Sequence, residues 1–142
     1  MRGEGVAGLV KQTPGSMGYV ELIYALQNQI AYGSVQNMDG AFVRASVDGV
    51  TAAAAGAAAQ MPADFRVSIT NAPGKATYPI SSFTWLLLYE NPKDKAMAKT
   101  MIDFVTWALT DGQKYCKDLG YAPLPSNVVQ MELAALKKIK LS

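Results

Sequence analysis

Apolar side chains recur at helical spacing along several stretches of the chain, which places them on one face of a helix. These stretches predict helices over residues 6–12, 21–28, 46–60, 94–112 and 126–136, with a further helical turn at 113–119. Ser46 and Ser126 are predicted N-caps, because a serine oxygen accepts hydrogen bonds from the free N–H groups of a first turn. The alanine tract within 46–60 favours a helix, and its small side chains indicate either close packing or a plain surface helix.

Shorter apolar runs bounded by Gly, Pro and Asn predict strands. They cover residues 17–20, 30–35, 65–70 and 83–89, with a tight turn at Asp39-Gly40 between two strand-like runs. Residues 83–89 (FTWLLLY) are apolar on both faces, as expected of a strand inside a sheet covered by helices. Strands alternate with helices, so the predicted fold class is α/β, with a mostly parallel or mixed sheet covered by helices.

The composition indicates a folded chain with a covered surface. Of its 142 residues, 50% are hydrophobic and only 17% are charged. This is enough for one core, and the low charge indicates that a partner, or a missing part of the protein, covers much of the surface. Residues 1–10 hold no apolar signal-peptide segment, and no apolar run approaches the ~20 residues that span a bilayer. We therefore expect either a cytoplasmic protein or an exported one whose front end is not part of this chain.

The residues that the chain lacks exclude several enzyme classes. It has no His and a single Cys, Cys116, which excludes an internal disulfide, a Cys/His zinc site, a Ser-His-Asp triad and a Cys-His pair. Cys116 is predicted to be a small buried apolar residue. The carboxylates of one helical region show no acid–base pairing: Asp103, Asp111 and Asp118. We predict that the chain is not an enzyme and has no catalytic or metal-binding residues.

The charge balance argues against a nucleic-acid partner. The chain has 13 basic and 11 acidic residues, for a net charge of +2, whereas nucleic-acid binding usually needs a clustered basic face. The basic cluster near the C-terminus is predicted to be a solvated helix end: Lys137, Lys138 and Lys140. The arginines are scattered and are predicted to be surface charges: Arg2, Arg44 and Arg66.

Aromatic and hydroxyl side chains receive structural interpretations. The aromatic residues lie in apolar runs and are predicted to be core residues rather than a stacking surface: Tyr19, Tyr24, Tyr32, Tyr78, Trp85 and Trp107. Met97 and Met101 are predicted members of a helical apolar stripe. Ser81, Ser82 and Thr84 are predicted to satisfy nearby backbone groups rather than to contact a ligand.

Three motifs, in a fixed order, carry a resemblance to a known family. The first is residues 14–21 (PGSMGYVE), followed by Tyr24-Ala25. The second is residues 78–84 (YPISSFT), and the third is residues 111–115 (DGQKY) followed by 119–125 (LGYAPLP). Together they resemble the C-terminal half of the phosphate-binding subunit of ABC phosphate importers, a type II periplasmic binding protein. The likeness covers essentially the whole chain.

The resemblance implies two partial lobes. Residues 1–77 would belong to the second lobe, and residues 78–142 would return to complete the first, with Tyr78-Pro79-Ile80 at the crossing between them. Each lobe would lack strands that its sheet needs, and unpaired sheet edges recruit other chains. We therefore expect either a homo-oligomer or a complementing N-terminal half that covers those edges.

The resemblance also implies where phosphate would bind. In the family it lies in a cleft between the lobes, held by an N-terminal Thr-Phe, a loop Ser, an Asp and an Arg…Ser-Gly-Thr group. All of these precede the resembling region, and the chain has no Ser-Gly-Thr. The family's Gly-Asn-Asp/Glu-Gly opening is here Arg2-Gly3-Glu4-Gly5. The candidate phosphate contacts are the backbone N–H groups of Gly3 and Gly5, although Glu4 repels an anion and a flexible cap is the preferred interpretation.

The function that the resemblance implies is an incomplete phosphate-binding receptor of an ABC-type import system, in the periplasm or cell envelope. Its partners would be inorganic phosphate and an ABC permease, with no cofactor. The alternative is a self-assembling or scaffold protein derived from the same fold, with no ligand. A second chain or partner that supplies the Arg and Ser-Gly-Thr group would distinguish the first from the second.

Overall fold

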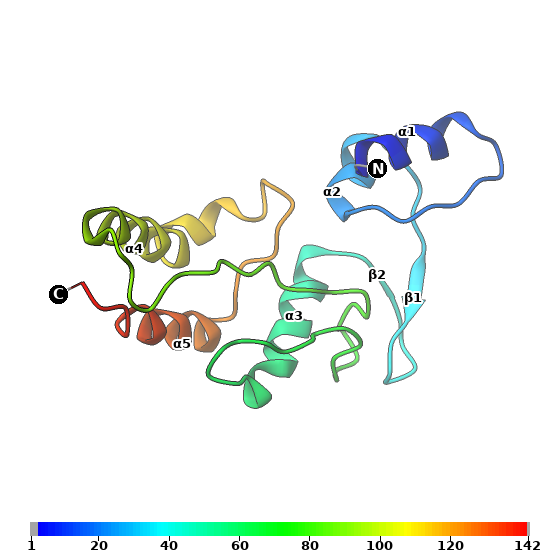
Figure 1. The fold of residues 1–142 in the computed structure, drawn as a ribbon. Helices are drawn as coiled ribbons and strands as arrows, with labels where there is room; N and C mark the ends of the chain where they lie inside the picture. The colour runs from blue at the N-terminus through cyan, green and yellow to red at the C-terminus, as the bar shows by residue number, and fades with distance from the viewer. Residues whose placement is uncertain (1–2, 142) are drawn as a thin grey trace.

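The computed structural model describes residues 3–141 and shows helices, short 3₁₀ turns and one small sheet (Figure 1). The elements are, in chain order, α1 (Gly3–Gln12), α2 (Leu22–Gln27), β1 (Ser34–Gln36), β2 (Phe42–Arg44), α3 (Val47–Ala57), η1 (Ala58–Gln60), α4 (Lys95–Leu109), η2 (Asp111–Tyr115) and α5 (Ser126–Leu136). The chain therefore combines helices with strands, as the sequence predicted.

The sheet is a hairpin rather than the predicted mostly parallel or mixed sheet. Strands β1 and β2 pair antiparallel, with Val35 opposite Val43, and form the one sheet among the described residues. The Asn37 N–H donates to the Ala41 carbonyl over 2.9 Å, and Gly40 adopts a φ of 78° in the turn. The predicted turn at Asp39-Gly40 is thus confirmed, because a glycine tolerates the left-handed backbone that this hairpin needs.

Three predicted strands are wrong for the described part of the chain. Residues 17–20, 65–70 and 83–89 form no strand ladder. Met17 and Tyr19, expected inside, are 96% and 94% exposed. A β-strand exists only through hydrogen bonds to a neighbour, and an apolar run without such a neighbour stays unpaired, whatever its β-propensity.

The helices follow the sequence more closely. The Ser46 hydroxyl accepts a hydrogen bond from the Gly49 N–H over 3.0 Å, so this predicted N-cap is confirmed. Asp94 caps α4 in the same way, accepting from the Met97 N–H over 2.9 Å. Ser126 is instead the first residue of α5, with Pro125 before it and no side-chain cap. The predicted Ser126 cap is therefore wrong by one residue.

The core lies against α3. Ala54 and Ala57 of this helix pack with the fully buried Ile69, and the half-buried Phe83 packs against this cluster. A side chain at Gly56 would place its Cβ 2.7 Å from the Pro73 carbonyl oxygen. The small residues of α3 therefore serve close packing, one of the two interpretations that the alanine tract left open.

A buried amide ties the hairpin to the segment that follows α3. The Asn37 Nδ2 group donates to the carbonyls of Gly74, Lys75 and Thr77 over 3.1, 3.2 and 3.1 Å. Its Oδ1 accepts from the N–H groups of Asp39 and Ala41 within its own turn. Because this side chain is buried and fully bonded, it fixes the 71–78 segment over the hairpin.

Helices α4 and α5 form a separate pair at the opposite end of the molecule from α1 and α2 (Figure 1). They bury Val105, Leu109 and Val128. The rest of the predicted α4 stripe is largely open to solvent: Met97, Met101 and Phe104 are exposed. The aromatic core predicted for Trp85 and Trp107 is also wrong, since both are exposed together with Tyr19, whereas Tyr24, Tyr32 and Tyr78 are half-buried.

Candidate functional site

The candidate phosphate contacts lie at the start of α1. Gly3 is half-buried, and any Cβ there would come within 2.6 Å of the Tyr24 ring on α2. This close packing of α1 on α2 gives Gly3 a structural role. Gly5 is exposed, and the exposed Glu4 carboxylate lies in the same first turn. An anion at this helix end would meet free N–H groups and a carboxylate together.

The arginines do not converge on a common site. The Arg44 guanidinium lies 4.3 Å from the centre of the Tyr32 ring, a cation–π contact. Arg66 pairs with Asp64 at 2.7 Å on the surface, and its hydrogen bond holds the pKa of the Asp64 carboxyl below its usual range. Both are surface charges, as predicted, while Arg2 lies outside the described residues.

The hydroxyl groups beside the predicted crossing serve the backbone. Ser81 is buried and donates to the Tyr78 carbonyl over 2.7 Å. Ser82 donates to the Phe83 carbonyl over 3.1 Å, and Thr84 is exposed. For the two serines the predicted backbone role is confirmed.

The residues that carry the family resemblance hold local structure together. A Cβ at Gly18 would approach the Val10 side chain to 2.8 Å, and one at Gly120 would approach Ile23 to 2.7 Å. The Gln113 side chain donates to the Ala108 carbonyl and accepts from the Leu124 N–H, both over short distances of 2.8 and 2.7 Å. These contacts explain the motifs by packing and backbone geometry.

The other candidate groups form no catalytic or metal-binding arrangement within the described residues. Cys116 is half-buried, rather than buried as predicted, and is unpaired with another cysteine. Within residues 3–141, no group of His, Cys, Asp and Glu side chains is arranged to hold a metal ion. Asp103 forms an ion pair with Lys99 at 2.8 Å on one face of α4. Burial alone raises the pKa of the Glu132 carboxyl on α5, and within residues 3–141 no neighbouring charge or hydrogen bond contributes to that shift.

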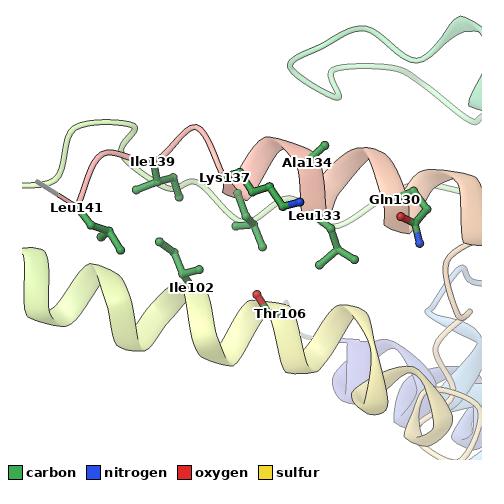
Figure 2. Close-up of a pocket in the computed structure, with 9 residues that line it drawn as sticks. Ile102, Thr106, Gln130, Leu133, Ala134, Lys137, Ile139 and Leu141 are labelled. Atoms are coloured by element: carbon green, nitrogen blue, oxygen red, sulfur yellow. The ribbon is translucent and has the colours of Figure 1, made fainter.

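Across the described part of the chain, none of the helices has the length and apolar character needed to cross a membrane. Two apolar grooves lie beside α4. One, of about 530 Å³, lies between α4 and α5 with the C-terminal residues that follow α5, and Ile102 and Leu133 point into this gap from opposite sides (Figure 2). The other, of about 610 Å³, is lined by Leu87, Met97 and Met101 among others. The sequence missed the second groove, because it placed residues 83–89 inside a closed sheet.

These grooves are poor sites for a small anion. Their linings are mainly apolar, and a phosphate ion needs several N–H, hydroxyl or cationic donors once it is dehydrated. Lys137 is the single cationic side chain that lines the first groove, and Lys93 lines the second beside Asp94. The grooves are better suited to apolar side chains than to a dehydrated ion.

Sequence comparisons identify relatives of the chain. No protein-family profile matches it. It is 44% identical over 127 residues to the phosphate-binding protein PstS of Xylella fastidiosa, covering 89% of the chain and 35% of that relative. The phosphate-binding protein PstS of Pasteurella multocida is 38% identical, with 89% and 37% covered. That of Methanocaldococcus jannaschii is 36% identical over 149 residues, with 96% and 38% covered.

The chain thus spans 35–38% of the length of the curated relatives it matches, less than the half that the motifs suggested. All three of these relatives are phosphate-binding proteins by name. The predicted resemblance to the phosphate-binding subunit family is therefore confirmed, for a stretch equal to little more than a third of each relative.

Proposed function

We propose that this chain is part of the phosphate-binding receptor of an ABC-type phosphate importer and has no complete phosphate site by itself. The observation that carries the proposal is the match to phosphate-binding proteins at 36–44% identity, combined with coverage of only 35–38% of their length. The receptor would act in the periplasm or cell envelope and hand phosphate to a membrane permease. It would be a binding protein rather than an enzyme.

The mechanism would be capture of a dehydrated ion. Backbone N–H groups at helix N-termini, hydroxyl groups and an arginine would hold the phosphate oxygens. An Asp would accept a hydrogen bond from the protonated oxygen of phosphate, which sulfate lacks at neutral pH. Closure of the two lobes would then trap the ion. The scattered arginines of this chain support the view that most of these contacts come from elsewhere.

Two lobes remain our proposal for the organisation of the chain. The proposed crossing at Tyr78-Pro79-Ile80 begins where the Tyr78 N–H donates to the Gly49 carbonyl over 3.1 Å, beside α3. Beyond it the chain leaves α3 and runs toward α4 and α5 (Figure 1). Residues 1–77 and 78–142 would thus contribute to different lobes of a type II periplasmic-binding fold.

Polypeptide from outside this chain would complete the phosphate site. The N–H groups of Gly3 and Gly5 are the contacts that we propose from this chain, and Glu4 beside them opposes a strong site. The missing donors would come from the part of a PstS-type protein that lies outside the match, because a second copy of this chain would also lack Ser-Gly-Thr. The exposed apolar residues around α4 support the need for such a cover.

Isothermal titration tests the proposal. Phosphate is titrated into the 142-residue chain alone, with sulfate as the control anion, and then into the chain mixed with the unmatched part of the Xylella relative. We expect no binding heat from the chain alone and phosphate-selective binding by the mixture. Tight, phosphate-selective binding by the chain alone would contradict the incomplete site, and a mixture that associates yet ignores phosphate would contradict the receptor function.

A further inference from the structure

Five lysines gather at one end of the α4–α5 pair, and we call this surface the basic end. They come from two distant segments, one around the start of α4 and one at and after the end of α5: Lys93, Lys95, Lys137, Lys138 and Lys140. The Lys140 N–H donates to the Glu90 carbonyl over 2.8 Å, and the Lys95 ammonium donates to the Lys140 carbonyl over 2.9 Å. These contacts hold the last residues of the chain beside the start of α4 (Figure 1).

The basic end carries positive charge that the chain does not neutralise. Among residues 3–141, none of its five lysines forms an ion pair, whereas Lys99, one turn further along α4, pairs with Asp103 at 2.8 Å. The same two segments hold two carboxylates, Glu90 and Asp94, so lysines outnumber acids there by five to two. Over the rest of the sequence nine acidic residues stand against eight basic ones. The net positive charge of the chain is therefore concentrated at the basic end.

Polypeptide that completes the receptor would leave these lysines in solvent. Four of them are exposed in the chain alone, and Lys95 is half-buried. Burial of an ammonium group without a charged partner is costly, so lysines are almost never fully buried unless they are paired. A covering polypeptide therefore gains stability from the apolar residues of α4 and not from the basic end. We expect the basic end to persist on the surface of the complete receptor.

The type of cation favours an anionic surface over a single shaped ligand. The basic end contains lysine and no arginine, since Arg44 lies against the Tyr32 ring and Arg66 pairs with Asp64. Lysine carries a point charge on a flexible stem, whereas the planar arginine fork is the usual group for recognising one phosphate or a nucleic acid. Clusters of about four to eight basic residues near a membrane attract anionic lipid headgroups. The sequence predicted a solvated helix end from three of these lysines, and the structure adds two more from the start of α4.

We propose that the basic end binds the anionic headgroups of a phospholipid membrane. The choice of a lipid partner rests on the proposed function, which has the chain act beside a membrane permease. The ammonium groups would lie at the level of the headgroup phosphates, and the attraction would fall off within a Debye length of the surface. Such binding would concentrate the receptor at the membrane, where its permease lies.

Vesicle co-sedimentation with a matched pair of double variants tests the basic end. The 142-residue chain is mixed with vesicles of phosphatidylcholine alone, or of phosphatidylcholine with an equal part of phosphatidylglycerol. We expect at least about tenfold tighter binding to the anionic vesicles, lost at about 0.5 M sodium chloride because salt screens the charges. Lys138→Glu with Lys140→Glu should weaken that binding at least about tenfold. Lys75→Glu with Lys114→Glu makes the same charge change at exposed lysines elsewhere and should weaken it less.

The outcomes separate this proposal from the receptor function. A preference for anionic vesicles that depends on Lys138 and Lys140, with no phosphate binding by the completed receptor, would support the basic end and overturn the receptor function. Phosphate-selective binding by the completed receptor, with equal binding to both kinds of vesicle, would overturn the basic end alone. Absence of vesicle binding, or equal weakening by the two double variants, would also overturn it.

Three further results would contradict the choice of a lipid surface. Displacement of the chain from vesicles by inorganic phosphate at constant ionic strength would identify an ion site instead. Binding to a DNA duplex or to an acidic protein as tight as binding to the anionic vesicles would identify a general polyanion surface. Loss of the lipid preference after addition of the unmatched part of the Xylella relative would show that this polypeptide covers the lysines.

Discussion

The middle of the chain and its last third differ in how they bury their apolar residues. Residues 34–82 close around α3, with Ile69, the Asn37 amide and three alanines of that helix (Ala53, Ala54 and Ala57) buried. Residues 83–141 bury few large side chains and leave many exposed: Trp85, Leu86, Leu87, Leu88, Tyr89, Met97, Met101, Phe104 and Trp107. The same chain therefore holds one part that is closed on itself and another that is open.

The difference shows what each part needs for stability. The middle part satisfies its buried polar groups internally, through the contacts of Asn37, Thr77 and Ser81. The last part forms its helices, but no other part of the described chain covers α4 and residues 83–89. Apolar patches of this kind mark interaction surfaces. Variants of the two parts should therefore respond differently.

The largest contrast in stability is expected between alanine substitutions of two apolar residues, one in each part. Ile69 is 1% exposed, so Ile69→Ala should lower the free energy of unfolding by about 2–5 kcal/mol, through lost burial and the cavity left behind. Met97→Ala in the open region should change it by less than about 0.5 kcal/mol. Urea denaturation of both variants measures the difference, and equal losses would remove the contrast between the two parts.

The next largest effect on stability is expected from substitution of the buried Asn37 amide. Asn37→Ala removes the hydrogen bonds of this amide to three carbonyls and two N–H groups, so we expect a loss of about 2–3 kcal/mol in the free energy of unfolding. Gln36→Ala is the matched control, because its exposed side chain makes one hydrogen bond to the Gly40 carbonyl. Thermal unfolding of the pair tests this, and a loss at Asn37 no larger than that at Gln36 would show that the amide does not hold the 71–78 segment.

Two glycine-to-alanine changes should have opposite signs. At Gly56 the new Cβ would meet the Pro73 carbonyl oxygen at 2.7 Å, so we expect a loss of about 1–2 kcal/mol despite the better helix propensity of alanine. At Gly8 of α1 nothing lies within 4 Å, so alanine should stabilise by up to about 1 kcal/mol. Urea denaturation checks both signs, and stabilisation by Gly56→Ala would contradict the close packing of α3.

The smallest expected effect depends on pH. Burial raises the pKa of Glu132, so the folded state favours its protonated form. Below the ordinary pKa of glutamate the carboxyl is protonated in both states, so its burial does not lower the free energy of unfolding. The free energy of unfolding then falls as the pH rises from the ordinary pKa through the raised pKa of the folded state. Glu132→Gln should raise the melting temperature at about pH 7 by more than at about pH 4, through a gain of under about 1 kcal/mol. An equal change at both pH values would show that burial does not perturb this carboxyl.

The sequence predicted local features well and long-range ones poorly. The Ser46 cap and the Asp39-Gly40 turn depend on residues a few positions apart, so their pattern is readable. The Asn37 contacts join groups 37, 38 and 40 residues apart, and no local pattern signals them. The apolar character of residues 83–89 predicted a buried strand, whereas the described chain leaves most of these residues exposed, because nothing in it pairs with them.

The candidate site illustrates the same limit. Motifs such as residues 14–21 carried the resemblance, and one of their glycines, Gly18, leaves no room for a side chain against Val10. The resemblance implies that the phosphate donors of the family precede the resembling region, and under that proposal no pattern in this chain would specify them. What the chain alone showed was an excess of exposed apolar surface, which points to a missing cover rather than to an ion site.

Phosphate titration, first into the chain alone and then into the chain joined by the unmatched part of the Xylella relative, tests the central claim most directly. We predict no binding by the chain alone and phosphate-selective binding, with no response to sulfate, by the combined protein. Phosphate-selective binding by the chain alone, or none after the two parts have associated, would contradict the claim that this chain is an incomplete phosphate receptor.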